Sequence, residues 1–544
     1  MSSIFNAINL RRVILVSFIT SLLVNIFFLY KDFTLYYYDS IARLNIARKT
    51  IDNLTPGLGQ LGVLWLPLPH ILNVPFIWND WIWHTGLSGT IISSLSFLIS
   101  IMFAYKMIFL LFKDHIASFL SALVLLLNIN ILYIQSTPMS EMFFIMTILG
   151  SMYYFINWIF TNNFLHLIFL AFFVFLSTLT RYEGYFIFLN SILLVILISK
   201  VKKTSINKIE GTTILFITLS SLGILLWFSY QALIFKDPFY WLKVYTKSIS
   251  IISVEDENRQ YIPITNEEIS SSLFFGIIRY FNAVVQINGV LFVCFIIILG
   301  FFSFIYFKKL NFYQKLSLFA LFFPIAVFMF TALALKGGFP LEAPHFSFLS
   351  FFDTNNYIFK EYNIRYGLNF IPFFVFLVGI LSSFNKYYKI LILILLITQM
   401  IGSNTNVFYL QYNIPKYLFL INYSKNHPKN ASYIKWFREH YDGGYIMISA
   451  LKHEPTMFYM NLPYKVFIHE GTKKYWKESI QNPQTYARWI FMYKPGITEG
   501  REEDSTTKFL KNNDNLYIFF EKKYEDEEIE IYKKKDMITK VNIN

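Results

Sequence analysis

The segment from residue 11 to residue 39 reads RRVILVSFITSLLVNIFFLYKDFTLYYYD, and it decides how the rest of the chain is interpreted. Two arginines precede an apolar run at 13–30, which is long enough to cross a hydrocarbon core about 30 Å thick as a helix. No small-residue cleavage pattern follows, so the run predicts an uncleaved anchor rather than a removed signal peptide. An acid, Asp39, then follows a run of tyrosines just beyond the predicted span.

The composition extends this interpretation to the whole chain. Hydrophobic residues make up 55% of the 544 residues, which is more than ordinary soluble domains contain. Charged residues separate many apolar stretches, and the predicted spans are 13–30, 87–112, 116–134, 139–160, 164–180, 184–199, 212–235, 288–307, 315–335, 367–384 and 388–403. We therefore expect a polytopic α-helical membrane protein with about 11 transmembrane helices.

The distribution of positive charge predicts the orientation. The formal net charge is +13, but lysines and arginines lie mainly at the ends of apolar segments, which argues against a nucleic-acid partner. Cytoplasmic loops carry an excess of these residues. This rule places the N-terminus in the cytoplasm and the loops 31–86, 236–287 and 336–366 outside, together with the tail. We predict a multi-pass protein of the cell membrane with most of its polar mass extracytoplasmic.

The composition changes abruptly near residue 404, which divides the chain into a transmembrane domain, 1–403, and an extracytoplasmic domain, 404–544. In the tail, β-prone runs at 445–449, 466–469, 489–493 and 516–520 alternate with helical patterns at 432–441, 455–460, 473–480 and 506–511. Alternating isoleucines and acids at 528–532 predict an edge strand. These patterns indicate a small α/β domain.

The first outer loop contains a helical pattern soon after Asp39. Ile41, Leu44, Ala47 and Ile51 recur at helical spacing, and basic residues occupy other positions. Amphipathic helices with this pattern bind at membrane surfaces. We predict a helix that lies flat on the membrane.

Asp39 is the first candidate for chemistry. It holds a carboxylate at the level of the lipid headgroups, directly after the first span. In sugar transfer from a phosphate-linked donor, the acceptor hydroxyl must lose its proton as it attacks, and a carboxylate can accept this proton. The alternative is that Asp39 only caps a helix that begins near Ser40.

Two short outer turns supply further candidates. Glu141 lies in STPMSE at 136–141, a turn with little room for a solvated charge. A carboxylate in hydrocarbon costs roughly 3 kcal/mol, so it should face a polar cavity or a partner, unless it serves the first helical turn. In the next outer turn Arg181 can bind a donor phosphate while Glu183 orients it, or the two can form a structural pair.

The tenth predicted span supplies a candidate phosphate anchor. Arg365 and Tyr366 begin this span after the loop that contains His345. The guanidinium of Arg365 can bind two phosphate oxygens and stabilise charge on a leaving phosphate, although the alternative is an arginine that reaches toward lipid headgroups. We add Tyr366, His345 and His70 to the substrate-binding candidates. No histidine spacing indicates a metal, and ordinary hydrogen-bonded histidines are the alternative.

Several stretches together resemble the GT-C glycosyltransferases, the superfamily that includes protein O-mannosyltransferases and lipid A aminoarabinose transferases. The stretches are YDSIAR at 38–43, LTPGLGQLG at 54–62, WLPLPH at 65–70, LTRYEG at 179–184 and NIRYG at 363–367. In addition, IHEGT at 468–472 resembles the tail region of glycosyltransferase-39-like prokaryotic membrane proteins. The resemblance covers nearly the whole chain.

The resemblance implies a donor sugar linked to polyprenyl phosphate and an inverting transfer with polyprenyl phosphate as the leaving group. The acceptor is a glycan, lipid or protein on the outer face. By its place after the first span Asp39 is the implied base, Glu141 lines the donor or acceptor cavity, and Arg365 approaches the carrier phosphate. The turn with Glu141 lacks the paired acids of oligosaccharyltransferase catalytic subunits, which argues against a required divalent metal.

Other functions fit a polytopic protein with an outer domain. A flippase or transporter for lipid-linked sugars is the chief alternative, followed by a glycan polymerase or ligase and by a glycan-binding scaffold. Transporters commonly place charges or broken helices at mid-membrane. In this chain the candidate charges lie at the outer ends of the predicted spans, which favours an enzyme.

Overall fold

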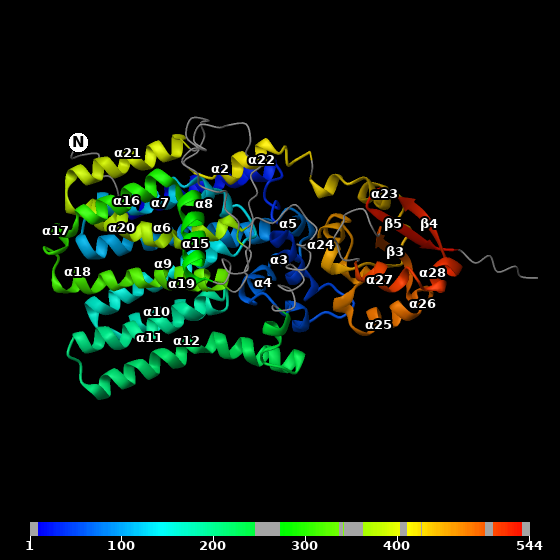
Figure 1. Cartoon of the computed structure of the whole chain (residues 1–544), viewed down its shortest axis with the longest axis horizontal. Helices are drawn as coiled ribbons and strands as arrows, with labels where there is room; N and C mark the ends of the chain where they lie inside the picture. Colours follow the sequence, from blue (N-terminus) through cyan, green and yellow to red (C-terminus); the bar gives the residue numbers. More distant parts are fainter. Residues whose placement is uncertain are drawn as a thin grey trace, which may run out of the picture.

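The computed structural model of the chain describes residues 9–244, 272–336, 341, 363–402, 411–425, 427–494 and 504–535. Figure 1 shows a bundle of long helices at one end and a smaller part with a β-sheet at the other. The short helices that follow the first span lie between these two parts. Along its longest axis, the molecule therefore consists of the helical bundle, the short helices and the part with the sheet, in this order.

The bundle contains both long helices and short helical pieces. Their bounds are α2 (Leu10–Tyr30), α6 (Leu87–Phe112), α7 (His115–Leu126), α8 (Ile129–Ile134), α9 (Glu141–Thr161), α10 (Phe164–Thr178), α11 (Glu183–Val201), α12 (Ile206–Phe235), α15 (Leu273–Asn288), α16 (Val290–Phe302), α17 (Phe304–Phe307), α18 (Phe312–Ser317), η2 (Leu318–Leu321), α19 (Phe322–Lys336), η4 (Ile364–Phe370), α20 (Ile371–Phe384) and α21 (Lys386–Gly402). Their inward-facing apolar side chains form one continuous core.

The described part of the chain has seven helices that are long and apolar enough to cross a membrane, or eight if the bent pair α15–α16 is one span. The predicted class, a polytopic helical membrane protein, is confirmed, whereas the count of about 11 spans is not. One reason is that the predicted span 116–134 is divided into α7 and α8. The side chain of Asn128 accepts hydrogen bonds from the first backbone N–H groups of α8 and starts this second helix.

Within the predicted outer loop 236–287, residues Leu273–Asn288 form the helix α15. This helix packs against α19 and buries Tyr280 and Ala283 completely. It meets α16 at an angle of 107°. The bend lies at Gly289, whose φ of +99° is unfavourable for residues with a side chain. Most of the predicted loop 336–366 lies outside the described residues.

The first outer loop forms four short elements, which are α3 (Tyr38–Lys49), η1 (Leu58–Leu61), α4 (Leu68–Asn73) and α5 (Asp80–His84). The predicted amphipathic helix is present as α3, but its predicted partner is wrong. Ile41, Leu44 and Ala47 are buried in a core that they share with apolar residues of the C-terminal part. Protein rather than membrane covers this face of α3.

The C-terminal part contains a five-stranded sheet with flanking helices. Its elements are α22 (Ile414–Leu420), η5 (Pro428–Asn430), α23 (Ser432–His440), β1 (Tyr445–Met447), α24 (Ala450–Tyr459), η6 (Tyr464–Val466), β2 (Phe467–Ile468), η7 (Glu470–Thr472), α25 (Lys474–Gln481), α26 (Pro483–Tyr486), β3 (Ala487–Tyr493), α27 (Ser505–Leu510), α28 (Asp514–Phe519), β4 (Phe520–Glu525) and β5 (Ile529–Lys534). The strand order is β2-β1-β3-β5-β4. The predicted mixture of helices and strands is confirmed.

Two predictions for this part are wrong. Residues 516–520 fall mainly in helix α28, because Asn513 caps it by accepting from the backbone N–H of Asn515. The strand predicted at 528–532 is β5, but it is not at an edge, because it pairs on both sides with β3 and β4. The charged strand β4 is an edge instead, and charge at an edge discourages pairing with other chains.

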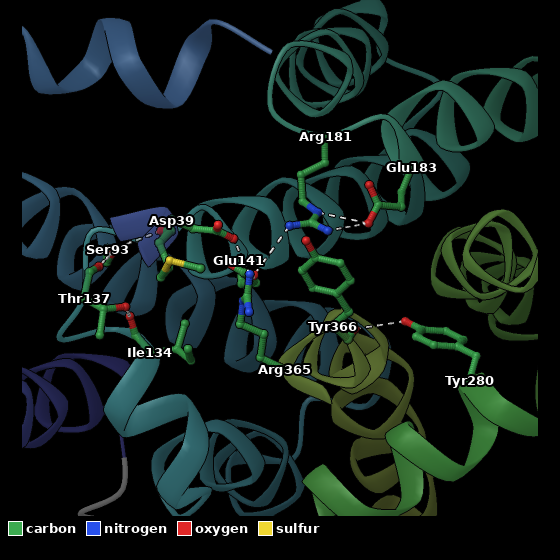
Figure 2. A network of polar contacts seen from close by, with 11 residues as sticks. Asp39, Ser93, Ile134, Thr137, Glu141, Arg181, Glu183, Tyr280, Arg365 and Tyr366 are labelled. Atoms are coloured by element: carbon green, nitrogen blue, oxygen red, sulfur yellow. Dashed lines mark hydrogen bonds and ion pairs between the residues drawn. The ribbon is translucent and has the colours of Figure 1, made fainter. Parts of the chain in front are cut away.

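The turn between α8 and α9 is held closely by α6. Thr90 and Ser93 of α6 donate hydrogen bonds to the backbone carbonyls of Ser136 and Thr137, at 3.1 and 2.7 Å. Figure 2 shows Ser93 and Thr137 beside the charged residues that are described below. Gly89 lies directly against Pro138, so that a Cβ at Gly89 would be 2.4 Å from the Cβ of Pro138. The position of this turn, and of α9 after it, therefore depends on a close approach to α6.

We expect Gly89→Ala to lower the free energy of unfolding by roughly 1–3 kcal/mol, because the added methyl group overlaps Pro138 and the turn must move. Gly211→Ala is the matched control, since a Cβ there has no neighbour within 4 Å. In a helix this control should leave stability unchanged or raise it slightly. Thermal unfolding of the detergent-solubilised variants measures both effects. Equal unfolding temperatures for the two variants would contradict the role of this contact.

Candidate functional site

Charged residues from four distant segments meet where the helical bundle joins the outer helices. Asp39 belongs to the first turn of α3 and Glu141 to the first residue of α9, while Arg181 lies in the turn before α11 and Arg365 in η4. Figure 2 shows these side chains pointing toward one another. We call Asp39, Glu141, Arg181, Glu183 and Arg365 the charged cluster. The sequence predicted each of its members separately.

Asp39 is an ion-pair partner in this cluster and not a helix cap. Helix α3 begins at Tyr38, and its N-cap residue Tyr37 makes no side-chain capping hydrogen bond. Arg365 donates from Nη2 to Oδ2 of Asp39. The Asp39 side chain is 32% exposed, whereas that of Glu141 is 0% exposed. Among the acids of the cluster, Asp39 is therefore the one that a substrate can reach.

Glu141 is fully buried between two arginines. Its Oε1 accepts from Nε of Arg365 at 3.0 Å, and Nη1 of Arg181 lies 3.5 Å from the same oxygen. Its Oε2 has no hydrogen-bond partner within the described residues. A buried carboxylate is tolerated when it is paired in this way. Both possibilities raised by the sequence are present, because Glu141 pairs with arginines and also lies in the first turn of α9.

The two arginines are also held by aromatic rings. Arg181 donates to Oε1 of Glu183 from Nε at 3.0 Å and from Nη2 at 2.8 Å, which is the structural pair considered from the sequence. Its guanidinium lies 4.4 Å from the ring centroid of Tyr366. The guanidinium of Arg365 lies 4.5 Å from the ring of Tyr37. Arg365 is buried, so the alternative that it reaches toward lipid headgroups is wrong.

Arg43 is the member of this region that the sequence analysis missed. It follows Asp39 by four residues on α3, which is one helical turn, and that spacing is the signal that could have identified it. Its guanidinium lies 4.7 Å from the ring centroid of Trp65. Arg43 is 7% exposed, forms no ion pair with the described residues, and its Nε has no hydrogen-bond partner there. Burial lowers the pKa of Arg43, although the carboxylates of Asp39 and Glu141 oppose this shift.

His70 contacts the backbone of α3 and does not belong to the charged cluster. Its Nδ1 lies 3.4 Å from the backbone oxygen of Arg43, and its ring stacks on Trp65. Burial and the nearby Arg43 cation lower the pKa of His70 to about 3, so it is neutral near pH 7. A buried neutral histidine fits a supporting contact better than phosphate binding. The other predicted histidine, His345, lies outside the described residues.

A cavity of about 480 Å³ lies beside Arg43 and Arg181. The residues that line the cavity are partly polar or aromatic and partly apolar: Arg43, Leu64, Trp65, Leu66, Thr180, Arg181, Tyr182, Glu183, Tyr185, Phe186, Trp241, Leu242, Phe330, Thr331, Leu333, Ala334 and Tyr366. The hydroxyl of Tyr185 and Nε1 of Trp241 are buried without a hydrogen-bond partner in the described part of the chain. The cavity thus combines unsatisfied polar groups with an apolar wall, as small-molecule sites do.

Comparisons with known proteins give the following results. A search against protein-family models found no match, and a search of curated proteins found none. Among solved structures, the chain is similar to crystal structures of ArnT from Cupriavidus metallidurans. The apo structure has 12% identity and a TM-score of 0.47, over 91% of this chain and 92% of that chain. The structure bound to undecaprenyl phosphate has 11% identity and a TM-score of 0.46, over 91% of this chain and 93% of that chain.

Proposed function

We propose that this protein is a GT-C-type glycosyltransferase that moves a sugar from a polyprenyl-phosphate carrier to an acceptor, with Asp39 as the general base. The observation that carries this proposal is the geometry around Arg43. A buried arginine without an ion-pair partner in the described residues lines a cavity with an apolar wall, one helical turn from an exposed carboxylate. A lipid phosphate satisfies both the cation and the apolar wall.

The proposed reaction is a single displacement at the anomeric carbon. The acceptor hydroxyl oxygen attacks this carbon, and the bond from the carbon to the phosphate oxygen breaks. The hydroxyl proton moves to the carboxylate of Asp39, and polyprenyl phosphate leaves with the electron pair. Arg365 occupies only Oδ2 of Asp39, and no other described group binds this carboxylate, so Oδ1 can accept the proton.

The two arginines near the cavity have different proposed roles. Arg43 binds the donor phosphate and stabilises the charge that develops on it as the bond breaks. Arg181 is bound by Glu183 and by the Tyr366 ring, so it contributes positive potential from a fixed position. The donors of Tyr185 and Trp241, which have no hydrogen-bond partner among the described residues, are available for sugar hydroxyl groups. Undecaprenyl phosphate, which the second ArnT structure holds, belongs to the proposed class of carrier lipids.

The apolar wall of the cavity suits the polyprenyl chain. Phe186 of α11 and Phe330, Leu333 and Ala334 of α19 contribute to this wall. Leu333, which lines the cavity, is 39% exposed. The donor would therefore enter from the membrane, with its headgroup at the charged cluster. In the proposed orientation, the N-terminus is cytoplasmic and the domain at 404–544 is extracytoplasmic, so the headgroup of the donor would lie on the outer side of the membrane.

Mass spectrometry of lipid-linked sugars tests the proposal. In cells that lack the protein, the lipid-linked donor should accumulate and one surface glycan, glycolipid or glycoprotein should lose a sugar. The purified protein in vesicles should then convert that donor to free polyprenyl phosphate when the acceptor is added. The two measurements together identify both substrates.

The same experiment separates the alternative functions. A flippase would move the donor across the vesicle membrane without forming free polyprenyl phosphate. A polymerase or ligase would consume a lipid-linked glycan of several sugars instead of one sugar. Unchanged donor pools and unchanged surface glycans in the deletion strain would reject the proposed function.

A further inference from the structure

Helix α3 connects the charged cluster to the C-terminal part of the chain. Its first turns carry Asp39 and Arg43, and its last turns carry Asn45 and Lys49. Figure 1 shows α3 between the helical bundle and the sheet, next to α24. Contacts between α3 and α24 join the two parts. The position of the proposed base therefore depends on what holds the far end of this helix.

Glu454 of α24 holds that far end. Lys49 forms an ion pair with its Oε1, and Asn45 donates to its Oε2 at 2.6 Å. Tyr464 also donates to Oε2, at 3.3 Å, and Asn45 reaches the backbone oxygen of Glu454 at 3.3 Å. The side chains of Lys49 and Glu454 are 9% and 19% exposed. The carboxylate of Glu454 therefore has three side-chain partners in a site that is largely closed to water.

The shape of α24 brings Glu454 to α3. His453 has non-helical backbone angles, and Pro455 follows inside the helix. A proline in a helix interior removes a hydrogen bond and produces a kink. The kink lies at His453, directly before Glu454, whose carbonyl accepts from Asn45 of α3. The C-terminal part thus presents both the side chain and the backbone of this residue to α3.

Helix geometry relates the two ends of α3. Ten residues separate Asp39 from Lys49, which corresponds to about 15 Å along a helix. A helix of this length moves as a rigid rod, so a shift of its last turns also shifts its first turn. Arg365 meets Asp39 at one end, and Glu454 meets Lys49 at the other. A displacement of about 1 Å at a reaction centre can lower a rate on the order of 100-fold.

We propose that Glu454 is a positioning residue, which holds α3 through Lys49 and Asn45 so that Asp39 and Arg43 lie correctly for sugar transfer. This inference rests on the proposed function. It assigns the C-terminal part an indirect role in the reaction at the membrane, through the position of α3. Glu454 touches no substrate and acts only through α3.

Charge reversal and its rescue test this role in vesicles with the lipid-linked donor. Glu454→Lys should lower kcat on the order of 100-fold, because two ammonium groups repel each other where one ion pair stood. Lys49→Glu alone should lower kcat similarly. The double variant Lys49→Glu with Glu454→Lys restores the opposite charges. We expect its kcat to reach at least about a tenth of the wild-type value, compared with the loss of roughly 100-fold expected for each single variant.

Two further variants make the outcome decisive. Glu454→Gln keeps the shape and should lower kcat roughly 10-fold, since charge-assisted hydrogen bonds are about twice as strong as neutral ones. Glu525→Lys is the matched control, because Glu525 pairs with Lys494 and Lys522 within the sheet and away from α3. It should leave kcat unchanged.

The results separate failure of this inference from failure of the proposed function. A wild-type protein that transfers no sugar rejects the proposed function. Full kcat in Glu454→Gln, or a double variant that is as slow as the single variants while its unfolding temperature is normal, overturns the role of Glu454 alone. If Glu454→Lys does not fold, the kcat of Glu454→Gln decides the question.

Discussion

Asp39→Asn should lower sugar transfer by roughly 100- to 10,000-fold, which is the usual contribution of general acid–base catalysis. The amide keeps the shape of the carboxylate but cannot accept the acceptor's proton. Donor binding should persist, because Arg43 and the apolar wall of the cavity are unchanged. Release of polyprenyl phosphate from reconstituted vesicles measures transfer, and binding of the labelled donor in detergent measures affinity.

Asp32→Asn is the matched control for this variant. Asp32 lies in the same outer loop, is 45% exposed and forms an ion pair with a lysine, Lys429. Its replacement removes one carboxylate near the membrane surface without touching the charged cluster, so transfer should continue at the wild-type rate. Normal transfer in Asp39→Asn would remove this residue from the mechanism, and the proposed reaction would then lack its base.

Arg43→Met and Arg365→Met should change stability in opposite ways. Arg365 pairs with buried Glu141 and with Asp39, so its removal leaves the buried Glu141 carboxylate with only the longer contact of 3.5 Å to Arg181. Such a loss costs about 3–5 kcal/mol of unfolding free energy. Arg43 has no ion-pair partner in the described residues, and burial already lowers its pKa. The unfolding temperature of Arg43→Met should therefore equal or exceed that of the wild-type protein.

Arg43→Met should nevertheless weaken donor binding roughly 10- to 150-fold, which corresponds to the loss of a hydrogen bond to a charged group. Methionine keeps the apolar stem that packs near Trp65, so the comparison isolates the charge. Thermal unfolding and donor binding are measured on the same purified samples. If Arg43→Met unfolds as early as Arg365→Met, Arg43 has a structural role and the proposed phosphate site loses its main support.

Local signals explain why the membrane class could be predicted. An apolar run of about 20 residues spans a membrane wherever it occurs in a chain, because each of its backbone groups is satisfied within the helix. Helix α2 and the long helices of the bundle therefore agree with the predicted spans. The bend between α15 and α16 was missed, because it depends on Gly289 and on contacts with α19.

The candidate residues were predicted one at a time, from charges at the ends of spans. Glu141 stood out because a charge beside hydrocarbon needs a partner, whereas Asp39 and Arg365 stood out by their places at the outer ends of predicted spans. Their meeting could not be predicted, since 326 residues separate Asp39 from Arg365 and 224 separate Glu141 from Arg365. Only the packing of α3, α9 and η4 brings them within hydrogen-bonding distance.

The sequence by itself determined the class of protein, the positions of most spans and the separate charged residues, because hydrophobic length and isolated charge act locally along a chain. Only the tertiary structure decided that Arg43 lines a cavity, that Glu454 holds the far end of α3, and that β5 lies inside the sheet. These features depend on contacts between residues far apart in the chain. Such contacts are selected by the packing of whole helices and strands, which no short stretch of sequence records.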